Sequence, residues 1–207
     1  MLGAGLEALG LGRDPVREQT LLDYLELLSR WNRIYNLTAV SDSDAMVTRH
    51  LLDSLAVVPH LRGDCFADVG SGAGLPGIPL AIWLTDCRFV LVDSSGRKVR
   101  FLRQAQIELQ LRNIEVVESR IQDWLPAQEF DGVLSRAFAS LPEFIAMAGH
   151  LPGPAGVFYA LKGRWPEPGV KSPGPSYGIA AVHELSVPGL AAPRHLVEIA
   201  PRGEQNP

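Results

Sequence analysis

Residues 68–77, which read DVGSGAGLPG, are the part of the chain best suited to chemistry. Apolar residues lead into this stretch from Cys65 and out of it from Ile78, a pattern that is typical of a strand, a loop and the start of a helix. Glycine permits positive φ and leaves no Cβ between the backbone and a ligand. The first amide groups of the following helix point toward the same place. The stretch therefore predicts a cradle for a small molecule.

This glycine-rich stretch fits two known patterns in two frames. From Gly72 it fits the G-x-G-x-x-G fingerprint of dinucleotide-binding proteins. From Asp68 it resembles the first motif of S-adenosylmethionine-dependent methyltransferases, D-x-G-x-G-x-G, whose glycines pass beneath the methionine part of the cofactor. A nicotinamide fold needs its first glycine at the strand tip, where Gly70 lies, and Leu75 then stands in the place of the third glycine. The pattern therefore favours the methyltransferase, with a purely structural turn as the alternative.

A second anchor for a nucleoside is Asp93, which ends the buried-strand pattern RFVLVD at residues 88–93. Its separation from Gly70 suits one βαβ unit, and a carboxylate there can accept hydrogen bonds from both ribose hydroxyls. Nicotinamide and methionine cofactors share this feature, so Asp93 supports a nucleoside ligand without choosing between them. The alternative is an acid that caps a helix before residues 94–96.

Basic residues gather at two places that suit an anionic substrate. Residues 97–103 place four cations on one predicted helix, and such a stripe either contacts phosphates or is an ordinary solvated face. Arg136 and Lys162 follow two predicted strands, at the edge of an α/β sheet where ligands bind. Two cations beside a cofactor pocket favour an anionic substrate such as RNA over a small neutral one.

Composition limits the class of protein. With 207 residues, of which 46% are hydrophobic and 20% charged, the chain is predicted to be a folded soluble protein. A net charge of −4 disfavours nonspecific binding to nucleic acid, so an RNA partner would need a local basic patch. Neither a membrane-spanning run nor a signal peptide is predicted. Cys65 and Cys87 are expected to be buried thiols, and the five histidines show no metal-ligand spacing. We expect a cytoplasmic protein without a metal site.

The elements that must position these residues alternate between strand and helix. Helical spacing of leucines predicts helices within residues 15–61, with a break near residues 38–44. Such alternation indicates an α/β fold with a parallel sheet and right-handed crossovers. The predicted strands are 65–69, 88–93, 113–118, 130–135 and 156–162. The predicted helices between them are 77–84, 96–111 and 141–150, with a short one near 120–124.

The end of the chain follows a different pattern. Residues 179–187 and 195–199 have no helical segment between them and predict a hairpin, so that a seven-stranded, mostly parallel sheet ends in antiparallel strands. The Gly- and Pro-rich stretch 163–178 is predicted to be a loop. The expected organisation is an N-terminal helical extension (1–62), a cofactor-binding domain (63–200) and a disordered tail (201–207).

Several linked motifs occur in one order along the chain. They are WNRIYNLT (31–38), RHLLDS (49–54), the glycine-rich stretch through residue 79, RKVRFL (97–102), SRAF (135–138) and YALKG (159–163). Together, over roughly residues 20–199, they resemble the RsmG (GidB) family, the bacterial small-subunit rRNA guanine-N7 methyltransferases. Linked motifs at matching separations are far more specific than a glycine loop alone.

The resemblance implies a Rossmann-like class I methyltransferase fold with an N-terminal helical extension. It also implies S-adenosylmethionine as cofactor and methylation of guanine N7 in 16S rRNA, free or in the small ribosomal subunit or its precursor. A monomer is the default expectation. Carried over by position, cofactor contacts fall on Gly70, Leu75, Asp93, Ile121, Gln122 and Arg136, to which the loop adds Ser71, Gly72 and Gly74. Contacts with RNA are expected at Asn36, Arg49, Arg97, Lys98, Arg100 and Lys162.

Methylation at guanine N7 needs little acid–base catalysis, because N7 carries a lone pair and no proton. Positioning of the reactants can then supply most of the acceleration. Arg136 is the expected catalytic residue, since its planar guanidinium can form paired hydrogen bonds with guanine O6 or a phosphate. His50 and Asp53 are expected to link the helical extension to the sheet. The alternatives are a small-molecule methyltransferase, a nicotinamide-dependent oxidoreductase and a noncatalytic RNA-binding module.

Overall fold

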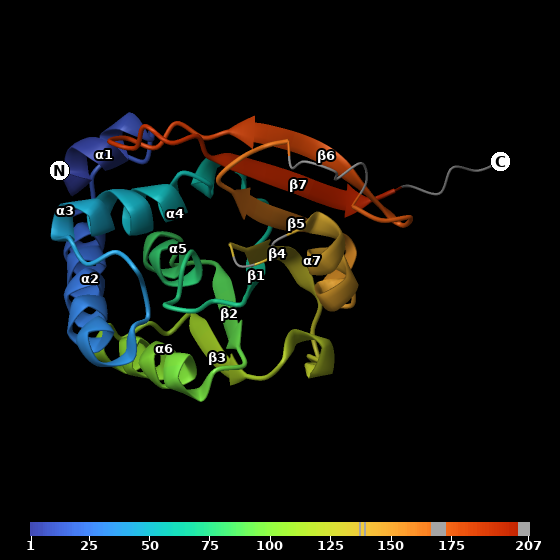
Figure 1. Ribbon diagram of the computed structural model, residues 1–207, viewed down its shortest axis with the longest axis horizontal. Helices are drawn as coiled ribbons and strands as arrows, with labels where there is room; N and C mark the ends of the chain where they lie inside the picture. The colour runs from blue at the N-terminus through green and yellow to red at the C-terminus, as the bar shows by residue number, and fades with distance from the viewer. Residues whose placement is uncertain (137, 139, 167–172, 203–207) are drawn as a thin grey trace.

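The computed structural model of the chain describes residues 1–136, 138, 140–166 and 173–202. Within this part of the chain, seven strands form one sheet in the order β3-β2-β1-β4-β5-β7-β6 (Figure 1). They are β1 (Cys65–Val69), β2 (Arg88–Asp93), β3 (Ile114–Glu118), β4 (Phe130–Ser135), β5 (Pro152–Lys162), β6 (Tyr177–Glu184) and β7 (His195–Pro201). The first five are parallel, and β7 runs antiparallel to both β5 and β6. The predicted α/β sheet with a C-terminal hairpin is confirmed.

The parallel strands are connected by helices α5 (Gly77–Trp83), α6 (Gly96–Glu108) and α7 (Leu141–Ala148), and by a short 3-10 turn, η3 (Ile121–Asp123). β2 is buried at every position after its first residue, as expected for a parallel strand that is covered on both faces. The prediction that α6 continues to residue 111 is wrong. The helix ends at Glu108, and Gln110 then takes a positive φ of 53° that stops it.

The N-terminal segments form α1 (Leu2–Ala8), α2 (Pro15–Tyr35), α3 (Ser43–Met46), a π-helical turn η1 (Val47–Leu52), α4 (Asp53–Leu55) and a 3-10 turn η2 (Val58–His60). The carboxylate of Asp14 caps α2 by accepting hydrogen bonds from the amides of Val16 and Arg17. Asn36 ends this helix in the left-handed conformation. The predicted helices within residues 15–61 are found, whereas α1 was not predicted.

The two faces of the sheet carry separate apolar cores. Phe89 and Leu91 of β2 pack in the core that includes α2, α5 and α6, whereas Val90 and Val92 pack in the core that includes α7. Figure 1 shows the N-terminal helices and α6 on one side of the sheet and α7 on the other. Among the described residues, no helix combines the length and the apolar content that are needed to cross a lipid bilayer.

The C-terminal boundaries differ from the prediction. β6 covers Tyr177–Glu184 rather than residues 179–187, and β7 continues through Pro201, where the tail was expected to begin. Beyond it, the amide of Arg202 still donates to the carbonyl of Ser176 at 2.9 Å. Residues 203–207 of the predicted tail, and residues 167–172 of the predicted loop, lie outside the described residues.

Candidate functional site

The glycine-rich loop begins where β1 ends, and its glycines serve different purposes. Gly70, Gly72 and Gly74 all have positive φ, with values of 72°, 60° and 84°. A Cβ built on Gly74 would overlap the side chain of Ile78, which is fully buried, so close packing disfavours a side chain there. A Cβ on Gly72 would meet only the carbonyl oxygen of Gly70, at 3.8 Å. The loop is therefore open at Gly72, where a ligand can approach the backbone.

Hydrogen bonds fix this loop to the neighbouring strand tip. The amides of Gly70 and Ser71 both donate to the carbonyl of Val92, at 2.8 and 3.1 Å. The hydroxyl of Tyr24 on α2 donates to the carbonyl of Ala73 at 2.7 Å, and this tyrosine is fully buried. The loop is thus held from β2 on one side and from the N-terminal helices on the other.

Asp93, at the end of β2, is the carboxylate that faces this loop. It accepts hydrogen bonds from the amides of Gly72 (3.0 Å) and Ser95 (2.9 Å), and its Oδ2 is 3.4 Å from Nζ of Lys98. Asp93 thus holds the glycine loop and satisfies an amide next to the start of α6, while its contact with the ribose hydroxyls stays a prediction. Lys98, which was grouped with the RNA contacts, lies here as the ion-pair partner of Asp93.

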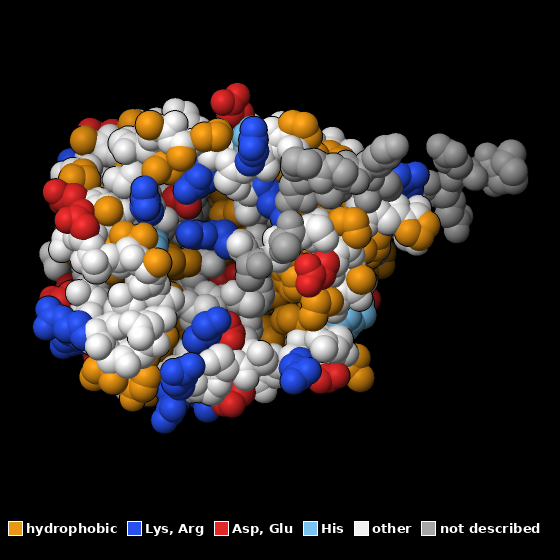
Figure 2. Space-filling model, in the orientation of Figure 1, with side chains coloured by type: hydrophobic (Ala, Val, Ile, Leu, Met, Phe, Trp, Pro, Cys, Tyr) orange, Lys and Arg blue, Asp and Glu red, His pale blue; other side chains and the backbone are white. Residues whose placement is uncertain are grey.

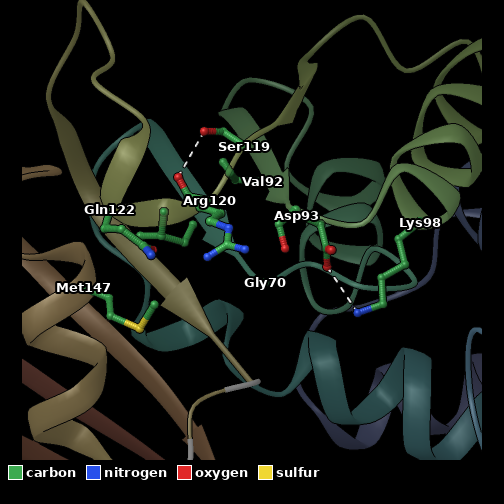
Figure 3. A pocket seen from close by; sticks show the side chains of 10 residues that line it. Gly70, Val92, Asp93, Lys98, Ser119, Arg120, Gln122 and Met147 are labelled. Atoms are coloured by element: carbon green, nitrogen blue, oxygen red, sulfur yellow. Dashed lines mark hydrogen bonds and ion pairs between the residues drawn. The ribbon is translucent and has the colours of Figure 1, made fainter.

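A cavity of about 340 Å³ opens between the carboxyl ends of β1, β2 and β3. Four of the predicted cofactor residues line it, namely Gly70, Asp93, Ile121 and Gln122. Figure 3 shows Asp93 and Lys98 on one side of this cavity and Gln122 and Met147 on the other. Its volume lies at the lower end of the range for small-molecule sites.

The remaining predicted cofactor residues do not line this cavity. Ser71, Gly72 and Gly74 belong to the adjoining loop, Leu75 is buried at 9% exposure, and Arg136 lines a different pocket. Conversely, Ser119, Arg120 and Met147 line the cavity and were not predicted. Ser119 and Arg120 follow the end of β3, so their position after a predicted strand was the signal that could have identified them.

Asp68, the acid that opens the motif, is fully buried at the end of β1. Its Oδ2 accepts a hydrogen bond from the amide of Gly77 at 3.0 Å, whereas its Oδ1 has no hydrogen-bond partner among the described residues. Burial, which is only partly offset by the Gly77 and Ser71 hydrogen bonds, raises the pKa of Asp68 to about 7. With one carboxyl oxygen left without a partner in the described part of the chain, the buried Asp68 favours its neutral form.

Arg136 follows β4, next to the glycine loop. The hydroxyl of Ser135 donates to the carbonyl of Val69 at 2.9 Å, which joins the tips of β4 and β1. Nη1 of Arg136 lies 3.5 Å from Oδ2 of Asp53, and Oδ1 of the same aspartate accepts from Nε of Arg194 at 2.9 Å. The expected link through Asp53 thus takes the form of one carboxylate that holds two arginines.

The family of the chain follows from its similarity to known proteins. The family model of GidB, described as rRNA small subunit methyltransferase G, matches residues 17–197. The chain belongs to the GidB family. The ribosomal RNA small subunit methyltransferase G of Enterobacter sp. (strain 638) is 48% identical over 196 residues, which cover 95% of both chains. That of Pectobacterium carotovorum subsp. carotovorum (strain PC1) is 50% identical over 197 residues, covering 95% of this chain and 96% of the relative.

Solved structures support the fold independently of sequence. A SAM-dependent methyltransferase from Aquifex aeolicus superposes with a TM-score of 0.59 at 16% identity, covering 84% of this chain and 98% of that one. A ribosomal protein L11 methylase from Lactobacillus delbrueckii subsp. bulgaricus gives a TM-score of 0.53 at 13% identity, covering 79% and 81%. The recognised family and the methyltransferase fold are therefore both confirmed.

The residues that were predicted to contact RNA lie on different elements. Arg49, Arg97 and Arg100 are exposed, and Asn36 is exposed at the end of α2. Lys162 lies in the pocket with Arg136, where its Nζ donates to the carbonyl of Phe138 at 2.9 Å. Figure 2 shows Lys and Arg side chains spread over one face, with several around its central hollow.

The prediction that the histidines form no cluster is wrong for His60 and His183. Their rings stack with centroids 4.0 Å apart, and Nε2 of His183 is 2.8 Å from Oε1 of Glu198. The ligand atoms of these three residues lie within 4.8 Å of one another, an arrangement that can hold a metal ion. The sequence hid this cluster because strand pairing of β6 with β7 and the position of η2 bring its members together.

Proposed function

We propose that this protein transfers a methyl group from S-adenosylmethionine to N7 of a guanine in the 16S rRNA of the small ribosomal subunit. The observation that carries this proposal is the GidB match, which spans both the glycine-rich loop and the Asp53–Arg136 contact. Relatives that cover the whole length of the chain bear the name of a small-subunit rRNA methyltransferase. The guanine N7 target comes from the family resemblance.

The residues of the cradle fit this cofactor. The open approach at Gly72 leaves room for the amino-acid part of the molecule. The carboxylate of Asp93 is positioned to accept the ribose hydroxyls, and Ile121 and Gln122 line the same cavity for the base. When bound, the cofactor supplies a methyl group on a positively charged sulfur.

Chemistry at N7 then depends on how the protein presents the base. Because N7 has a lone pair and no proton, the enzyme need not remove a proton, and alignment of the base supplies most of the acceleration. Arg136 lies at the tip of β4, beside the strand from which the glycine loop emerges. Its guanidinium can donate to guanine O6, an acceptor on the same edge of the base as N7. This contact would orient the base without any change in protonation.

A methylation assay tests the proposal directly. Small subunits and 16S rRNA from cells that lack the gene are incubated with the protein and S-adenosylmethionine, and the nucleosides are then analysed by mass spectrometry. We expect 7-methylguanosine at one position. Methyl incorporation into another base, or none into either RNA substrate, would contradict the proposal.

Thermal unfolding with added ligands separates the alternatives. We expect S-adenosylhomocysteine to raise the unfolding temperature and NAD to leave it unchanged, because a ligand stabilises the state that binds it. A shift with NAD alone would favour an oxidoreductase, and no shift with either would favour a noncatalytic RNA-binding module. We further propose a cytoplasmic monomer, to be checked by sedimentation of the purified protein.

A further inference from the structure

A second, smaller pocket of about 190 Å³ lies at the carboxyl ends of β4 and β5. Among the described residues, it shares no lining residue with the cofactor cavity. Its polar lining comes from four distant segments: Asp53 on α4, Arg136 after β4, Lys162 at the end of β5, and Arg194 and His195 at the start of β7. The pairing of β5 with β7 brings Lys162 next to His195, because these two residues are partners in the sheet.

The charges in this pocket are unbalanced. Among the described residues that line it, the guanidinium groups of Arg136 and Arg194 face one carboxylate, that of Asp53. Asp53 is almost fully buried, with 5% of its side chain exposed, whereas the side chains of Arg136 and Arg194 are 30% and 25% exposed. The arginines are therefore fixed from beneath by the carboxylate and remain open to solvent above it.

The geometry favours an anion with several oxygen acceptors. A guanidinium carries five N–H donors, and its planar fork matches the oxygens of a phosphate. Arg194 uses Nε for Asp53 and Nη1 for the carbonyl of Pro193, at 2.9 Å each, which leaves its Nη2 donors for a ligand. A volume of about 190 Å³ is small for a whole nucleotide but suits a single phosphate group.

We propose that this pocket binds one phosphodiester group of the RNA that carries the target guanine. Arg194 contacts the phosphate, and Asp53 is the positioning residue that fixes Arg194 and Arg136 relative to each other. The Ser135–Val69 hydrogen bond sets the pocket beside the glycine loop, so a phosphate held here would place its nucleotide next to the methyl donor. This proposal rests on the proposed function, because it takes RNA as the substrate.

The number of phosphate contacts can be measured through the salt dependence of RNA binding. Each lost contact with a single strand lowers the slope of log affinity against log salt by about 0.7, and with a duplex by about 0.9. The test compares Arg194→Ala with Arg88→Ala. Arg88 is a matched control, because it also forms an ion pair, with Glu115 at 2.6 Å, but lies at the opposite edge of the sheet.

We expect Arg194→Ala to lower the salt slope for 16S rRNA by about one contact and to raise the KM for RNA, with the Kd for S-adenosylhomocysteine unchanged. Arg88→Ala should match the wild type in all three measurements. Equal slopes for the two variants, with wild-type methylation intact, would overturn the phosphate site and leave the proposed function standing. Absence of methylation by the wild type would overturn the function itself.

Arg194→Ala removes one of the two arginines that contact Asp53, so it is compared with three further variants. Arg194→Lys keeps the charge and should restore the salt slope with only part of the affinity. Asp53→Asn tests positioning: we expect a higher KM for RNA with the cofactor Kd unchanged, and partial rescue by Asp53→Glu. If Asp53→Asn weakens cofactor binding and RNA binding equally, Asp53 is a general structural residue and the positioning role is wrong.

Discussion

The two halves of the ligand-binding edge of the sheet are built in different ways. On the cofactor side, at the tips of β1, β2 and β3, a loop of consecutive residues presents backbone amides and one carboxylate, Asp93. On the acceptor side, at the tips of β4 and β5, side chains from four distant segments meet in a small charged pocket. The first is a local backbone structure, and the second is an assembly of long-range side-chain contacts.

Two of the buried aspartates, Asp53 and Asp68, show the same contrast. Asp53 on the acceptor side is held between two arginines, whereas Asp68 on the cofactor side accepts the Gly77 amide with one oxygen and has no hydrogen-bond partner for the other among the described residues. A backbone cradle can be kept while side chains on other segments change. This division explains how methyltransferases with one fold can act on different acceptors.

Replacement of Arg136 is the sharpest way to break this comparison, because this residue lies where the two halves meet. We expect Arg136→Ala to lower kcat for rRNA methylation by about 100-fold or more, the size seen when a group that orients or stabilises the reacting centre is removed. Cooperative thermal unfolding should persist. Arg136→Lys keeps the charge without the planar fork and should recover only a small part of the rate. Near-normal turnover by Arg136→Ala would remove Arg136 from the reaction.

The same contrast explains what the sequence could reveal. The cradle was predictable because a strand, glycines and an acid at fixed spacing lie within residues 68–93, where local rules apply. The Asp53–Arg194 contact joins residues 141 positions apart, and no local rule reports such a pair. The family motif at residues 49–54 identified Asp53 but not the arginines that contact it. No sequence pattern pointed to Arg194.

Asp93 tests the cofactor side alone. Hydrogen bonds to a charged group are each worth about 1.5–3 kcal/mol, so Asp93→Ala should weaken S-adenosylhomocysteine binding by roughly 10- to 100-fold in calorimetric titration. The affinity for RNA should stay within about twofold, because the acceptor pocket shares no residue with the cavity. Asp93→Asn keeps the size of the side chain and serves as the control for loop packing. A parallel loss of RNA affinity would show that the two halves are not independent.

The pH dependence of stability tests the partnerless carboxyl. A folded-state pKa of about 7 for Asp68, against an ordinary value of 3.8, means that the folded protein binds more protons than the unfolded chain between these values. Its contribution to stability is therefore present at low pH and is lost as pH rises from about 4 to about 7, by an amount on the order of 4 kcal/mol. Asp68→Asn cannot titrate and should remove this part of the pH dependence in urea unfolding. If the free energy of unfolding of Asp68→Asn depends on pH as that of the wild type does, the pKa of Asp68 lies near its ordinary value.

The sheet was predicted more accurately than its ends. The spacing of the apolar runs predicted the alternation of strands and helices correctly, because apolar runs between helical segments are compatible with few other folds. The limits of α6 and β6 were wrong by a few residues, since a left-handed residue at Gln110 and the pairing of β6 with β7 decide them. The short helix α1 was missed because its burial depends on contacts with η1 rather than on its own pattern.

The smallest expected effect concerns the support that the N-terminal helices give to the cofactor loop. Tyr24→Phe removes the hydrogen bond to the carbonyl of Ala73 and should lower the free energy of unfolding by about 1 kcal/mol. Tyr35→Phe on the same helix is the control, because no hydrogen bond from the Tyr35 hydroxyl is found in the described part of the chain. We expect Tyr24→Phe alone to weaken S-adenosylhomocysteine binding, by about two- to fivefold, with the KM for RNA unchanged. Equal cofactor affinities in the two variants would show that α2 stabilises the fold without shaping the loop. Cofactor binding would then depend on the glycine-rich loop and its neighbouring strands alone.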